Sequence, residues 1–117
     1  MAVISFSEES SDAGWVVAGW AFRQLFEDVM LAHPDDREMA AIFDRAEAVG
    51  YFFLDNLNKE LAVRVTAAIK KVAAGILAGT IQSGIVDRFH DEQTTQEYLN
   101  GLRMLLEAAQ AGESHAT

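Results

Sequence analysis

The sequence predicts an all-α fold, an antiparallel bundle of four main helices preceded by an extended N-terminal arm. Three observations favour this class. Half of the 117 residues are hydrophobic, which argues against disorder. One proline and eight glycines leave few residues that break helices. Apolar residues recur at three- and four-residue spacing over most of the chain, and the length fits a single domain over residues 1–117.

The N-terminal residues 2–9 alternate between polar and apolar side chains. Ile4 and Phe6 alternate with Ser5 and Ser7, a pattern typical of an extended segment rather than of a helix start. We therefore expect an extended arm, and its apolar Phe6 indicates that the arm packs onto another surface.

The first helix is expected over about 11–33, because Pro34 disfavours the helical conformation in the residue before it. This helix contains an uncharged stretch, Gly14 to Phe22, with two tryptophans. Side chains five positions apart on a helix point about 140° away from each other. Trp15 should therefore face the core, and Trp20 should lie on the back of the helix.

The apolar residues on the back of this helix predict self-association. A four-helix packing does not need both faces of its first helix, so the second apolar strip is left for another chain. We predict a homodimer, whose isologous interface involves the arm and the first helix. The interface residues are Phe6, Val16, Trp20 and Leu31.

The second helix, over about 35–56, has the clearest amphipathic pattern of the chain. Ile42, Phe43 and Phe53 are among the residues that this pattern turns toward the core. The third helix, over about 58–79, is rich in alanine and glycine, which allow a neighbouring helix to approach closely.

The C-terminal third contains a segment with two alternative structures, followed by the last helix. Gly79 and Gly84 flank a segment near 81–90 that is either a bent continuation of the third helix or a short extra helix. The last helix is expected over about 94–111, since Thr94 and Glu97 have the spacing of a capping box.

The charge balance narrows the choice of partners. Eighteen acidic residues against nine Lys and Arg give a net charge of −9, which disfavours binding to nucleic acids and to anionic membranes. Four basic residues nevertheless stand together in the third helix: Lys59, Arg64, Lys70 and Lys71. They indicate either a solvated helix face or a polar docking stripe for an acidic partner.

One polar cluster has the spacing of metal ligands. On a helix, Asp87, His90 and Asp91 would share one face. The same residues also suit an ordinary polar helix end, and no further ligand completes the site, so we expect no cofactor.

Paired carboxylates at Glu8-Glu9-x-x-Asp12 and Asp44-x-x-Glu47 leave a metal-dependent (Mg²⁺ or Mn²⁺) all-α hydrolase as an alternative. Neither pair clearly faces a shared pocket on the helical wheel.

The chain contains no cysteine, no segment that resembles a secretory signal and no apolar run that approaches the length of a membrane span. We therefore expect a cytoplasmic protein that does not associate with membranes. Since no catalytic motif stands out, we expect a small acidic, non-enzymatic protein that acts through protein–protein contact as a homodimeric binding, adaptor or regulatory protein. The alternatives are the metal-dependent hydrolase and a bundle that binds a small ligand.

Overall fold

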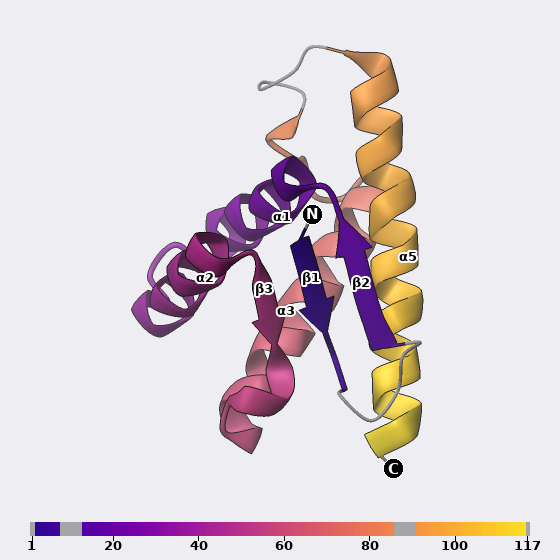
Figure 1. Cartoon of the computed structure of the whole chain (residues 1–117). Coiled ribbons are helices and arrows are strands. Elements are labelled where there is room, and N and C mark those ends of the chain that lie inside the picture. Colours follow the sequence, from indigo (N-terminus) through magenta and orange to yellow (C-terminus); the bar gives the residue numbers. More distant parts are fainter. Residues whose placement is uncertain (1, 8–12, 86–90, 117) are drawn as a thin grey trace.

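The computed structural model describes residues 2–7, 13–85 and 91–116, which form four helices and a three-stranded mixed sheet (Figure 1). The predicted all-α bundle is therefore wrong, because the protein combines α and β structure, although helices dominate. The difference lies in three short strands, β1 (Ala2–Ser5), β2 (Gly14–Val17) and β3 (Tyr51–Phe53).

The sheet has the order β2-β1-β3, so the N-terminal segment is its central strand rather than an arm. β1 runs antiparallel to β2 and parallel to β3. Ile4 pairs with Trp15 on one side and with Phe52 on the other, and all three side chains are buried. These three residues define the inner face of the sheet.

The first helix is much shorter than predicted. α1 (Gly19–Ala32) begins only after β2, whereas the sequence predicts a helix over 11–33. The β-branched pair Val16-Val17 suits a strand better than a helix, and pairing with β1 supplies the hydrogen bonds that a helix would otherwise provide. Trp15 is buried as predicted, but it reaches the core from a strand.

The second predicted helix, over 35–56, divides into three elements. α2 (Arg37–Val49) ends at Gly50, which has the left-handed conformation (φ 84°) and caps the helix with its backbone N–H. β3 follows at once, and then a 3-10 turn, η2 (Leu54–Asn56). In the strand the buried aromatic residue is Phe52, whereas Phe53 is only half-buried, the reverse of the helical prediction.

The third helix agrees closely with its predicted range of 58–79. α3 (Lys59–Ala78) starts after Asn58, whose side chain accepts a hydrogen bond from the Leu61 backbone N–H (2.8 Å), and it ends at Gly79 (φ 81°). The predicted segment near 81–90 lies partly outside the described residues, since 86–90 are not among them.

The last helix, α5 (Glu92–Ala116), is longer than the predicted 94–111. It lies beside β2 (Figure 1), and the Trp15 indole Nε1 donates a hydrogen bond to the Gly101 carbonyl oxygen at 2.8 Å. Near its end, Gly112 packs against the backbone of Phe6 so closely that a Cβ atom there would come within 2.8 Å of the Phe6 Cβ. The N-terminal segment is therefore held against α5.

The core joins the sheet to the helices through an aromatic cluster. Phe26 of α1 stacks on Phe43 of α2 with a centroid separation of 4.2 Å, and Phe52 of β3 meets both rings edge-on at 5.8 and 5.9 Å. Across the residues that the structure describes, no helix is long and apolar enough to cross a membrane.

Candidate functional site

The predicted metal cluster contains one residue that the structure describes. Asp87 and His90 lie outside the described residues. Asp91 precedes α5, and its carboxylate accepts hydrogen bonds from the Thr94 hydroxyl (2.7 Å) and the Gln93 backbone N–H (3.2 Å). These bonds, the one from Thr94 first, lower the pKa of Asp91. Asp91 therefore acts as the cap of α5, the role that the sequence suggested for Thr94.

The described ranges, 2–7, 13–85 and 91–116, contain no group of three His, Asp or Glu side chains placed to hold a metal ion. The carboxylate pairs that suggested a metal-dependent hydrolase do not supply such a group among the described residues. Asp44 is exposed on α2 and Glu47 is half-buried, while residues 8–12 are not described.

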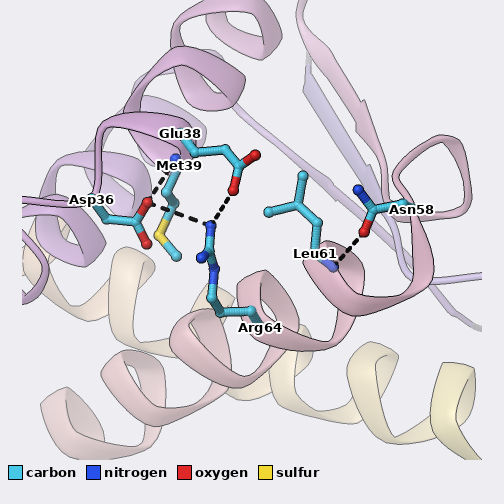
Figure 2. A network of polar contacts seen from close by, with 6 residues as sticks. All are labelled: Asp36, Glu38, Met39, Asn58, Leu61 and Arg64. Atoms are coloured by element: carbon cyan, nitrogen blue, oxygen red, sulfur yellow. Dashed lines mark hydrogen bonds and ion pairs between the residues drawn. The ribbon is translucent and has the colours of Figure 1, made fainter.

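The four basic residues of α3 do not form one docking stripe. Arg64 contacts the start of α2, where its Nη2 lies 2.7 Å from the Glu38 Oε1 and 3.5 Å from the Asp36 Oδ1 (Figure 2). Asp36 also caps α2 by accepting a hydrogen bond from the Met39 backbone N–H. Since Arg64 is half-exposed, this contact contributes modestly to stability.

The other three basic residues are divided between two sides of α3. Lys59 and Lys70 both line a pocket, which we call the α3 pocket, and Lys71 is exposed outside it. Lys70 also takes part in an interaction within the chain. The predicted stripe thus becomes one interhelical contact, one exposed lysine and two lysines at a pocket.

The four predicted association residues are divided among three parts of the fold: Phe6 follows β1, Val16 is in β2, and Trp20 and Leu31 are in α1. Phe6 is buried and packs against Gly112 of α5. Trp20 is half-buried, with its ring 6.3 Å from that of Tyr98. Val16 is 54% exposed on β2 and Leu31 is 69% exposed near the end of α1. Because residues 14–17 are a strand, no continuous apolar strip runs along the back of one helix.

The outer face of the sheet is mostly apolar, with Ser5 as a polar member beside Phe53, and it is partly open to solvent. Val3 pairs with Val16 on one side and with Tyr51 on the other, which places the three side chains in a row across the strands. Val16 and Tyr51 are about half-exposed, and Val3 and Phe53 are partly exposed. We call these four residues the outer sheet face. The sequence analysis found only Val16, although the aromatic run after Gly50 was a signal for a strand.

A groove of about 380 Å³ lies along β3 beside this face. β3 is an edge strand, so alternate backbone groups on its outer side have no strand partner in the sheet. Arg45 and Asn56 are the polar residues that line the groove. Its apolar lining comes from α2, from β3 and from the residue after η2: Ile42, Ala46, Val49, Tyr51, Phe52, Phe53 and Leu57.

The α3 pocket is larger, with a volume of about 680 Å³, within the range of small-molecule sites. One wall is a face of α3, a second comes from the segment around η2, and a third from Phe6 and the end of α5. Most of the lining is apolar or small: Phe6, Leu54, Leu57, Ala62, Val63, Thr66, Ala67, Ala109 and Gly112. Within the described part of the chain, three charged side chains also line it, namely Asp55, Lys59 and Lys70.

A buried polar cluster surrounds Asp28 of α1, and the sequence analysis missed it. The Asp28 Oδ1 accepts hydrogen bonds from the Gln24 Nε2 (3.0 Å) and the Gly84 backbone N–H (2.9 Å). Its Oδ2 accepts from the hydroxyls of Ser83 (2.5 Å) and Tyr98 (2.8 Å). Gln24 and Asp28 stand four residues apart in an otherwise apolar helix face, which was the available signal.

The Asp28 cluster joins three segments and has little access to solvent. Asp28, Gln24, Ser83 and Tyr98 are all buried. Burial, and then the neighbouring Asp28 charge, raises the pKa of Tyr98 above its ordinary range, so the phenol stays protonated and donates. Four donors saturate the carboxylate, which suits a structural tie between α1, the segment after α3, and α5.

In comparisons with protein-family models, with curated proteins and with solved structures, no match to this chain was found.

Proposed function

We propose that the protein acts by binding other protein chains, and that its first partner is a second copy of itself, docked through the outer sheet face. The observation that supports this proposal is the row Val16, Val3 and Tyr51, which presents apolar side chains to solvent across all three strands. Exposed apolar patches of this kind are typical of interaction sites.

The geometry of the row favours pairing with an identical face. A two-fold axis parallel to β1, lying above Val3 midway between two facing sheets, would place Tyr51 of one copy over Val16 of the other, and Val16 over Tyr51. Two sheets packed in this way lie about 10 Å apart and bury their facing side chains between them. The four side chains of the face are uncharged, so two acidic molecules can approach there without bringing like charges into contact.

The outer sheet face thus replaces the helical strip as the proposed dimer surface. The role stays that of a non-enzymatic binding, adaptor or regulatory protein, with protein rather than nucleic acid as the partner of a chain of net charge −9. We place it in the cytoplasm, because a chain without cysteine suits a reducing compartment.

Sedimentation equilibrium of the full chain at high micromolar concentration tests the proposal. The wild type should sediment with twice the mass of one chain. Val16→Lys and Tyr51→Lys should each sediment as folded monomers, because a lysine on the face opposes the packing of a second sheet. Lysine also makes the net charge less negative, so general repulsion cannot cause the dissociation.

Two exposed apolar residues elsewhere serve as controls. Leu31→Lys on α1 and Met104→Lys on α5, at positions 69% and 60% exposed, should leave the dimer intact. A monomeric wild type would exclude the homodimer. A dimer that only Leu31→Lys disrupts would move the interface from the sheet to α1. Circular dichroism spectra of all four variants confirm that each is folded.

A further inference from the structure

The α3 pocket shares no residue with the outer sheet face, so it supports a separate inference. Its walls come from segments far apart in the sequence. Phe6 is fixed there by a backbone hydrogen bond to the Ala13 carbonyl (2.9 Å) and by its close packing on Gly112. On the opposite wall, Ala62 and Ala67 present only methyl groups. The volume of about 680 Å³ therefore results from small side chains on α3 facing a well-anchored aromatic residue.

Among the described residues that line the pocket, the balance of charge is positive, opposite in sign to that of the whole molecule. Two lysines and one aspartate line it, whereas the chain carries a net charge of −9. Lys59 and Lys70 lie on one face of α3 and are separated by eleven residues, or about 16 Å along the helix axis. Asp55 comes from the segment before α3, four residues from Lys59, whereas Lys70 lies three turns farther along the helix.

We propose that the α3 pocket binds a long-chain carboxylate, with the alkyl chain along the apolar wall of α3 and the carboxylate at Lys70. An alkyl chain suits a lining of methyl groups and aromatic carbon, which it would cover from water. Lys70 is half-buried beside the apolar wall, where the effective dielectric constant is lower than in water and attraction to an anion is stronger. The carboxylate would share Lys70 with the interaction that this residue makes within the chain.

Calorimetric titration of the full chain with dodecanoate, below its micelle concentration, tests the inference. Dodecanoate should bind at one site per chain. Dodecanol, with the same alkyl chain and no charge, should bind about tenfold more weakly, the value of one charge-assisted hydrogen bond.

Two lysine variants separate the pocket from general electrostatics. Lys70→Met keeps most of the aliphatic stem and should weaken dodecanoate binding about tenfold while leaving dodecanol unchanged. Lys71→Met removes the same charge one residue farther along α3, outside the pocket, and should leave both affinities unchanged. Equal losses in the two variants would overturn the assignment of the carboxylate to Lys70.

A third variant tests the position of the alkyl chain. Ala67 is exposed on the pocket wall, so Ala67→Trp can fill the pocket without disturbing the core, and it should abolish binding of both ligands. Thermal unfolding of each variant confirms that it is folded. The inference fails if the wild type does not bind dodecanoate, or if Ala67→Trp binds it as well as the wild type does. Neither outcome bears on the dimer, which is measured separately.

Discussion

Replacing Asp28 by alanine should destabilise the protein strongly, because four donors lose their acceptor together. The substitution leaves the hydroxyls of Ser83 and Tyr98, the Gly84 N–H and the Gln24 amide in a buried site. A buried donor without a partner costs about 1–3 kcal/mol. Part of that cost is offset, since the carboxylate no longer has to be desolvated, and breaking buried charged networks costs about 3–5 kcal/mol in total.

The expected loss for Asp28→Ala is therefore about 3–5 kcal/mol in the free energy of unfolding. For a chain of 117 residues the entropy of unfolding is about 0.25 kcal/mol/K, so the Tm should fall by about 12–20 °C. Urea unfolding followed by tryptophan fluorescence measures the free energy directly. The slope of that free energy against urea concentration should stay unchanged if only the folded state is affected.

Two variants calibrate this result. Asp28→Asn keeps the size of the side chain and one acceptor oxygen, and its amide can donate to the hydroxyl oxygens, so it should lose only about 1–2 kcal/mol. Asp44→Ala removes an exposed aspartate of α2 and should change the stability by less than about 0.5 kcal/mol. If Asp28→Ala behaves like Asp44→Ala, the cluster does not tie the three segments together and the reasoning is refuted.

Two further predictions concern Tyr98 and the register of β3. The pKa of Tyr98 is raised in the folded state by burial and by Asp28, so its contribution to stability is complete below the unfolded pKa of about 10 and is lost as the pH rises above it. Unfolding measured between pH 9 and about 11.5 should show a decline that is shallower in Tyr98→Phe, by at most about 1.4 kcal/mol per pH unit. Equal slopes in the two proteins would contradict this. For β3, Phe52→Ala should cost about 3–5 kcal/mol by emptying a core site, and Phe53→Ala about half as much or less because its ring is partly exposed. The opposite order in urea unfolding would support the helical arrangement of residues 51–56.

Features that depend on local spacing can be predicted from the amino-acid sequence alone. The range of α3 follows from a helical period within one segment, and the structure buries apolar residues that recur at this period, namely Val65, Ile69 and Val72. The core role of Trp15 was also predicted correctly, since a helix and a strand can each turn one large residue inward. The period is a property of neighbouring residues, so no tertiary contact is needed to find it.

Contacts between distant segments determine which segments form strands and which buried polar groups meet. In the pairing of β1 with β2, Ala2 lies opposite Val17, and in the pairing of β1 with β3, Val3 lies opposite Tyr51. Such pairings join residues that are distant in the sequence. Val16-Val17 and the aromatic run of β3 have strand propensity, but the hydrogen bonds that make them strands come from β1.

The same distinction separates the candidate sites from their sequence predictions. In the Asp28 cluster, Tyr98 contacts a residue of α1 that lies seventy positions earlier in the chain. At the α3 pocket, Phe6 packs against Gly112. A spacing rule can place Lys59 and Lys70 on one face of a helix. It cannot say what packs opposite that face, because the opposite wall belongs to segments whose position only the folded chain determines.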